Sequence, residues 1–240
     1  MKRLVYSTIA ILALGSTVVN AGGVIMEPPS PPKKIIVNND KWSGPYIGLQ
    51  AGYIQGKADG EIIIIQVDPS FKGIKPKGFI GGIYAGYNKL LGDNWLAGIE
   101  LTYNYTNIKK TTNLIDENGY TTSSQFHLKQ KGEFALYAKF GKVIGDNDST
   151  LVYGLAGATG TKLDGGYEND GIIMWDKDTV YGFTVGAGVE YKIDQNWHAR
   201  VQYRFSKYKD AKYTFTNNIT GKVKKYKTHS IMAGISYHFN

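Results

Sequence analysis

The chain has 240 residues, with 30 glycines, 18 tyrosines and no cysteine, and its formal net charge at pH 7 is +8. This length fits one large all-β domain or two small domains, and the aromatic content argues against a disordered chain. After the N-terminus no apolar run reaches the ~18–20 residues of a membrane-spanning helix, which excludes a helical membrane protein. The lack of cysteine excludes a disulfide-stabilised secreted module.

The N-terminal segment, residues 1–21, has the features of a secretory signal peptide. Lys2 and Arg3 precede an apolar stretch, residues 4–14, and small residues precede the predicted cleavage site after Ala21. The alternative is an amphipathic first helix of the mature fold, but the segment is apolar on all sides. Export also makes nucleic acid an unsuitable partner for the basic mature chain.

A proline-rich segment, residues 22–43, follows and contains the sequence MEPPSPPKK. Proline has no backbone N–H to contribute to a strand ladder, so we expect an extended linker in the periplasm. Residues 44–240 would then form the folded domain.

Eight later segments alternate apolar and polar residues, the pattern of a strand whose two faces differ. In the clearest of them, residues 94–106, Trp95, Ile99 and Leu101 share one face while Glu100 and Asn104 share the other. The eight segments span residues 46–54, 78–88, 94–106, 126–141, 151–160, 179–192, 197–205 and 230–239. Several reach the ~9–11 residues with which a tilted strand crosses a bilayer.

The connections between these segments alternate in length. Long ones cover about residues 57–77, 107–123, 161–178 and 206–229, and short ones cover about 89–94, 142–149 and 193–196. Outer-membrane barrels alternate long extracellular loops with short periplasmic turns in this way. We therefore predict an all-β fold, an eight-stranded antiparallel up-and-down transmembrane β-barrel. The run EIIIIQV, residues 61–67, breaks the alternation and is assigned to a hairpin above the membrane, while its use in a ten-stranded barrel stays open.

The apolar face of each strand is predicted to point outward, into lipid. An eight-stranded barrel has room inside for one filling of side chains, so it could not enclose this many aromatic residues. An aromatic girdle is expected near the short-turn end, formed by Tyr46, Trp95, Tyr191, Trp197 and Tyr237.

The opposite face carries charges that would point inward: Glu100, Lys129, Lys131, Glu133, Lys139, Glu190, Arg200 and Arg204. Buried charges are costly unless paired, so we expect salt bridges between facing strands. We interpret six of these residues as an interior charge network that plugs the barrel: Glu100, Glu133, Lys139, Glu190, Arg200 and Arg204. The alternative is a charged constriction in a small-solute pore.

The start and end of the barrel region, WSGPYIGLQAGY at 42–53 and ISYHF at 235–239, resemble small outer-membrane β-barrel proteins. That family includes OmpA transmembrane-domain-like and OmpX-like proteins and the 25–31 kDa surface antigens of alpha-proteobacteria. The resemblance implies a place in the Gram-negative outer membrane. It also implies that the barrel-assembly machinery reads Tyr237 and Phe239 as an assembly signal, displaced by one residue because Asn240 follows. Relatives are described as haemin binders, adhesins, immune-modulating antigens or porins, so the family leaves the function open.

The histidines divide into two pairs. His198 and His238 have inward parity near one end of the barrel and are expected to form interior hydrogen bonds. His127 and His229 lie near the outer end and could bind haemin together with loop aromatics such as Tyr120 or Tyr226. Otherwise we expect no cofactor and no metal. No motif arranges a catalytic set, so a lipid A-modifying enzyme is a minor alternative.

The fourth long connection is rich in lysine: Lys207, Lys209, Lys212, Lys222, Lys224, Lys225 and Lys227. These lysines alternate with the aromatic residues Tyr208, Tyr213, Phe215 and Tyr226. The segment is either a solvated hairpin or a docking surface for lipopolysaccharide phosphates or acidic host surface molecules. We therefore expect a monomeric, non-enzymatic outer-membrane protein that acts through mobile extracellular loops, with haemin binding and small-solute transport as alternatives.

Overall fold

The computed structural model describes residues 42–63, 70–116, 118–169, 171–215 and 219–239. The predicted signal peptide, residues 1–21, and nearly all of the proline-rich segment lie outside the described residues, as do residues 64–67 of the isoleucine-rich run. No helix in the described part of the chain is long and apolar enough to cross a membrane.

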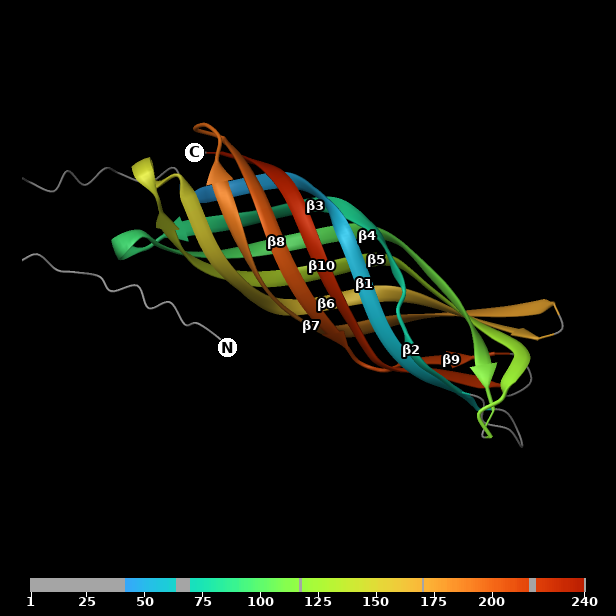
Figure 1. Cartoon of the computed structure of the whole chain (residues 1–240). Coiled ribbons are helices and arrows are strands. Elements are labelled where there is room, and N and C mark those ends of the chain that lie inside the picture. The colour runs from blue at the N-terminus through green and yellow to red at the C-terminus, as the bar shows by residue number, and fades with distance from the viewer. Residues whose placement is uncertain (1–41, 64–69, 117, 170, 216–218, 240) are drawn as a thin grey trace, which may run out of the picture. The chain divides into compact units, whose positions relative to one another are not determined.

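The described residues form a single antiparallel sheet of ten strands that closes on itself (Figure 1). Closure comes from pairing of the first and last strands, from Tyr46 opposite His238 to Ile63 opposite Thr220. The strands are β1 (Gly44–Ile63), β2 (Ser70–Ile74), β3 (Lys77–Leu90), β4 (Trp95–Ile115), β5 (Thr121–Ile144), β6 (Thr150–Asn169), β7 (Ile172–Lys192), β8 (Trp197–Tyr208), β9 (Ala211–Thr214) and β10 (Thr220–His238). Two short 3-10 helices, η2 (Gly92–Asn94) and η3 (Asp146–Asp148), form two of the short turns.

The ten strands occupy eight positions around the barrel. β2 and β3 both pair with β1 and follow one another along it, separated by Lys75 and Pro76. β8 and β9 both pair with β10 in the same manner, separated by Lys209 and Asp210. Proline cannot donate to a ladder, and Pro76 instead accepts a hydrogen bond from the Gly56 N–H at 2.7 Å. The predicted eight-stranded up-and-down barrel is confirmed, with two of its eight strands interrupted.

The outer surface of the half that holds the short turns is apolar, as predicted. Phe79 is 78% exposed, and Leu49 and Tyr105 are each 63% exposed, which suits contact with lipid rather than water. Near the short turns the rings of Trp95 and Phe140 stack at 5.1 Å. The girdle prediction was wrong for Tyr46, which is buried inside the barrel. The other four predicted girdle residues, Trp95, Tyr191, Trp197 and Tyr237, lie on the outer face.

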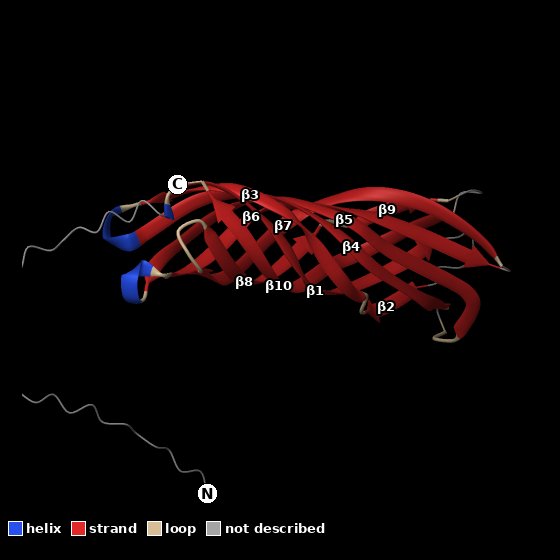
Figure 2. Ribbon diagram, turned by 90° about the horizontal axis from the view of Figure 1, so that it is seen from above, coloured by secondary structure: helices blue, strands red, loops and turns tan. Residues whose placement is uncertain are grey.

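Beyond this apolar band the strands continue as a regular sheet, where long loops were expected (Figure 2). The predicted loop 107–123 is largely the outer ends of β4 and β5, and only residues 116–120 connect them. Likewise β1 continues through Ile62, which pairs with Gly221 of β10, so the isoleucine-rich run begins inside the barrel wall. Leaving residues 61–63 out of the barrel wall was therefore wrong, although β1 and β2 do form a hairpin here, with Glu61 opposite Ser70. We call the part of the barrel beyond the apolar band, which includes the outer ends of β1, β4 and β5, the extracellular extension.

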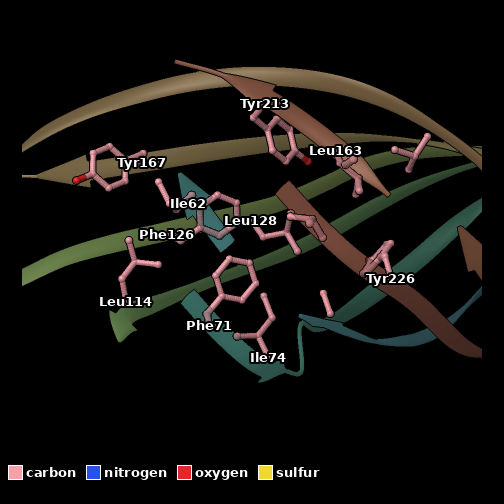
Figure 3. Close-up of a cluster of buried hydrophobic side chains, with 14 of the residues drawn as sticks. Ile62, Phe71, Ile74, Leu114, Phe126, Leu128, Leu163, Tyr167, Tyr213 and Tyr226 are labelled. Atoms are coloured by element: carbon pink, nitrogen blue, oxygen red, sulfur yellow. The ribbon is translucent and has the colours of Figure 1, made fainter. Parts of the chain in front are cut away.

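The extracellular extension has its own apolar core (Figure 3). The rings of Phe71 and Phe126 stack at 4.8 Å, and Tyr213 lies 6.3 Å from Phe126. The buried cluster comprises Ala58, Ile62, Phe71, Ile74, Leu114, Phe126, Leu128, Leu163, Tyr167, Val180, Tyr208, Ala211, Tyr213, Phe215, Val223 and Tyr226. The extension is therefore packed like a soluble barrel, with apolar residues inside, and strands stand where long loops were expected.

A bulge in β5 reverses which side chains point inward. The pairing of β5 with β6 shifts register between Gln130, opposite Leu163, and Gly132, opposite Lys162, so Lys131 is the extra residue. A bulge adds one residue, so every side chain beyond it changes face. Phe126 is consequently buried, whereas Lys129 and Lys131 lie on the outer wall. The predicted inward parity of these two lysines was wrong.

Candidate functional site

The interior of the membrane-spanning half is crossed by ion pairs, and the pair of Arg200 and Glu100 is at its centre. Arg200 comes from β8 and Glu100 from β4, four positions away around the sheet and therefore on the opposite wall. The guanidinium Nη1 lies 2.5 Å from Glu100 Oε2 and Nη2 lies 3.1 Å from Oε1. Nη2 also donates to Gln50 Oε1 at 2.7 Å. The planar fork of arginine matches a carboxylate in this bidentate way, so the two walls are joined across the lumen.

A second ion pair lies toward the extracellular extension. Arg204 Nη2 of β8 is 3.4 Å from Glu133 Oε1 of β5. The Tyr208 hydroxyl donates to Glu133 Oε2 at 2.8 Å, and Asn104 Nδ2 donates to Oε1 at 3.4 Å. Arg204 Nη1 donates to the Tyr137 hydroxyl at 3.0 Å. Buried charge is tolerated here because hydrogen bonds occupy several of the remaining polar positions.

A third cluster lies near the short turns and centres on Glu190. Lys139 Nζ is 3.3 Å from Glu190 Oε2, while His198 Nδ1 and His238 Nε2 lie 2.9 and 3.2 Å from Oε1. The two imidazole rings stack at 3.7 Å, and the Tyr46 ring stacks on His238 at 4.9 Å. These five side chains come from five different strands, and the pairing of the strands places them at the same level along the barrel.

The donor atoms of Glu190, His198 and His238 lie within 4.8 Å of one another, a spacing that could hold a metal ion. The charge balance argues against one. Among the described residues, each of the three buried glutamates already faces a basic side chain, with Glu100 beside Arg200, Glu133 beside Arg204 and Glu190 beside Lys139. A divalent ion would add uncompensated charge to a buried site. The arrangement is a set of buried ion pairs that join facing strands across the interior of the barrel.

Trp42 closes the end of the barrel that carries the short turns. It is fully buried, its indole Nε1 donates to the Asp148 carbonyl at 2.9 Å, and its ring lies 4.6 Å from that of His198. Trp42 falls within the predicted linker, residues 22–43, so its role in closing the barrel was not predicted. The sequence feature that could have indicated this role is a lone tryptophan directly before the first strand, in a segment otherwise rich in proline and polar residues.

The predicted lysine-rich surface separates into an outer and an inner layer. Lysines 207, 209, 212 and 225 are exposed on the outer wall, and lysines 222, 224 and 227 are half-buried there. Their aromatic neighbours Tyr208, Tyr213, Phe215 and Tyr226 lie inside, in the core of the extracellular extension. Because these aromatic side chains are buried, the lysines form the outer surface without the aromatic residues with which they alternate in the sequence. Burial, together with the charge of Asp178, also raises the pKa of the Tyr213 phenol.

Comparison with known proteins agrees with this architecture. Residues 22–239 match the family model of the outer membrane protein beta-barrel domain. The chain belongs to this family. Over its whole length it is 26% identical to the whole of the 31 kDa outer-membrane immunogenic protein of Brucella melitensis biotype 1. It is 28% identical to the 25 kDa outer-membrane immunogenic protein of Brucella canis, with 100% of this chain and 99% of the relative covered.

Among solved structures, the outer-membrane protein OprG from Pseudomonas aeruginosa superposes with a TM-score of 0.52 at 13% identity, covering 82% of this chain and 98% of OprG. This similarity shows the shared fold. The resemblance to small outer-membrane barrels and the place of the protein in the Gram-negative outer membrane are confirmed.

The two outer histidines of this outer-membrane barrel lie on different walls. His127 of β5 is held by Thr111 Oγ1 at 2.8 Å and by Glu168 Oε2 at 2.6 Å. His229 of β10 contacts the Tyr203 hydroxyl at 2.6 Å. Because β5 and β10 are four positions apart in the closed sheet, the structure does not bring the two predicted haemin ligands together.

The residues of the predicted assembly signal lie at the end of the last strand of the outer-membrane barrel. The Tyr237 ring is 5.3 Å from Trp197 and 5.1 Å from Phe239, and all three belong to the outward face. The Phe239 N–H donates to the Pro45 carbonyl at 3.0 Å, so the end of the chain is tied to the first strand. Recognition of Tyr237 and Phe239 by the assembly machinery stays a prediction.

Proposed function

We propose that this protein is a non-enzymatic, non-conducting outer-membrane barrel that presents a rigid basic extension at the cell surface. The bridging of the lumen by Arg200 and Glu100 carries this proposal, because these side chains join opposite walls in the middle of the membrane-spanning half. Two further ion-pair clusters, centred on Glu133 and Glu190, support it. A plugged interior leaves the outer surface as the part of the molecule that can act.

The extracellular extension suits interaction with polyanions. Its apolar core holds the strands in place, and its outer wall carries the seven lysines of the fourth predicted loop. Lysine binds phosphate and sulfate groups as a point charge. We infer that its partners are anionic surface molecules, either lipopolysaccharide of the same membrane or acidic host molecules. The relatives described as immunogenic support display at the cell surface.

Three further properties belong to the proposal. The protein is a monomer, requires no cofactor or metal, and is inserted by the barrel-assembly machinery through Tyr237 and Phe239. The separation of His127 and His229 favours neither haemin binding between them nor a haemin transport role. The balanced ion pairs of the interior favour a plug over a small-solute pore.

Planar-bilayer conductance of the purified, refolded protein tests this function. We expect no discrete openings from the native protein at a concentration where insertion has been demonstrated. The double variant Glu100→Ala/Arg200→Ala removes the central bridge and serves as the positive control, with measurable openings expected. Steady openings from the native protein would show that the interior charges line a path, and the proposed plug would be abandoned.

A further inference from the structure

Three lysines form a row on the outer wall of the barrel. In the register of the sheet, Lys57 of β1 stands opposite Lys227 of β10, and Lys227 stands opposite Lys207 of β8. Side chains directly opposite on neighbouring strands have Cβ atoms about 4.5–5.5 Å apart, and like charges in that position are destabilising. We call these three residues the lysine row. β8, β10 and β1 lie side by side in Figure 1.

The lysine row differs from the lysines farther from the membrane in its lack of acidic partners. Lys224 Nζ lies 2.5 Å from Glu61 Oε1, and Lys222 Nζ lies 3.9 Å from Asp210 Oδ2. Among the described residues, no carboxylate lies within 4.0 Å of the amines of the lysine row. Three adjacent positive charges without counter-charges form a favourable position for an external anion.

The lysine row lies at the outer boundary of the apolar band. Below the lysine row, β1, β10 and β8 carry five further rows of outward side chains, and each row has one residue from each strand. Going down to the girdle, the rows are Gln55, His229 and Phe205; Tyr53, Ile231 and Tyr203; Ala51, Ala233 and Val201; Leu49, Ile235 and Ala199; and Ile47, Tyr237 and Trp197. From Tyr237 to Lys227 the chain rises about 33 Å at ~3.3 Å per residue. A strand tilt of ~35–45° converts this to about 23–27 Å along the barrel axis, which matches the ~25 Å apolar band of such barrels. The lysine amines therefore lie at the level of the lipid headgroups.

We propose that the lysine row binds the phosphate groups of a phosphorylated glycolipid of the outer leaflet, the lipid A portion of lipopolysaccharide. The phosphates would lie against Lys57, Lys207 and Lys227, and the acyl chains would lie on the apolar wall directly below. The Tyr203 hydroxyl and the His229 ring, 2.6 Å apart, supply polar groups at the junction between headgroup and acyl chains. This inference rests on the surface-interaction role proposed above and names its partner.

The position of the row favours a membrane lipid over a soluble polyanion. A soluble glycan approaches from outside and meets first the higher lysines, of which Lys222 and Lys224 already have acidic partners. A lipid of the outer leaflet reaches the lysine row without leaving the bilayer. The acyl chains of such a lipid are also buried against Ile231 and Tyr53, which are 61% and 43% exposed.

Binding of diphosphorylated lipid A to the refolded full-length mature protein in mixed micelles tests the proposal. The variant Lys57→Gln/Lys207→Gln/Lys227→Gln is compared with Lys89→Gln/Lys110→Gln/Lys177→Gln, which removes the same charge from exposed positions outside the row. We expect the first variant to bind lipid A at least about tenfold more weakly at low salt and the control to stay within about twofold of the native protein. Dephosphorylated lipid A should bind all three proteins equally weakly, and heat-modified gel migration should show that each is folded.

Equal loss in both variants would show that net charge alone attracts the lipid, and the lysine row would be rejected. A loss of heparin binding with unchanged lipid A binding would assign the row to a soluble polyanion and would also reject it. If the triple variant fails to fold, the single variant Lys227→Gln decides, since Lys227 is the central lysine and a loss of lipid A binding is expected from it alone. Bilayer conductance reports separately on the plug, so the two proposals can fail independently.

Discussion

Arg200 and Glu100 lie on opposite walls of the barrel and meet in its middle, with Nη1 2.5 Å from Oε2. Both side chains are almost completely buried. The pair therefore bridges the interior of the barrel, where a solute crossing the lumen would pass. It also ties β8 to β4, two strands that share no hydrogen-bonded edge.

Removing one partner of this pair should destabilise the barrel more than removing both. Arg200→Met leaves the Glu100 carboxylate buried without its cation, which typically costs about 3–5 kcal/mol. The double variant Glu100→Gln/Arg200→Met leaves no unpaired charge and should recover part of that loss. Urea unfolding in lipid vesicles, analysed as a double-mutant cycle, measures the coupling. Additive single effects would show that the pair contributes no interaction energy.

Trp42 should contribute strongly to stability although it precedes the first strand. Trp42→Ala removes a fully buried indole and its hydrogen bond to the Asp148 carbonyl, and substitutions of this kind cost about 3–5 kcal/mol. Urea unfolding of the variant measures the loss. Trp95→Ala is the matched control, because Trp95 lies on the lipid-facing surface. An effect of Trp42→Ala no larger than that of the control would mean that the base of the barrel closes without this residue.

The apolar core of the extracellular extension should protect it from proteases. Phe126→Ala removes the ring that stacks on Phe71 at 4.8 Å and should open the extension while leaving the membrane-spanning half folded. Limited proteolysis of intact cells should then cut the extension several times faster than in the native protein. Tyr120→Ala, at a position 74% exposed, should leave the cleavage rate unchanged. Equal rates in the Phe126→Ala variant and the native protein would contradict a packed extension.

The turn between β7 and β8 should lose stability in acid. The backbone N–H groups of Trp197 and Asn196 each donate to Asp194 Oδ1 at 2.8 Å, and these bonds hold the pKa of the Asp194 carboxyl below its usual range. A folded-state pKa below the unfolded value stabilises the protein above the unfolded pKa, near 3.9, and this contribution is lost as pH falls through the folded pKa. Comparing the unfolding of native protein and Asp194→Asn across pH should show a difference at neutral pH that disappears in acid. A difference that persists unchanged in acid would assign the effect to something other than ionisation.

The strands and the lipid-facing side of the barrel were predictable because they depend on local patterns. The alternation of Trp95, Ile99 and Leu101 with Glu100 is contained in one short segment, and a strand turns successive side chains to opposite faces wherever it lies. The outward direction of the apolar face followed from volume alone, since eight strands enclose too little space for the aromatic residues. Inward positions for Glu100, Glu190 and Arg200 were predicted from the same alternation, and the structure places these side chains inside the barrel.

The tertiary structure alone decided which residues meet. The β5 bulge at Lys131, which reversed the faces of Phe126 and Lys129, arises from register with neighbouring strands that no local pattern records. The pairing of Lys57 with Lys227, from opposite ends of the chain, depends on closure of the sheet. In the extension the apolar side chains turn inward, because its outer wall contacts water and no longer lipid. The sequence by itself determined the period of each strand and its lipid-facing side, whereas register and closure, which are properties of strand pairs distant in the chain, decided the ion-pair partners and the lysine row.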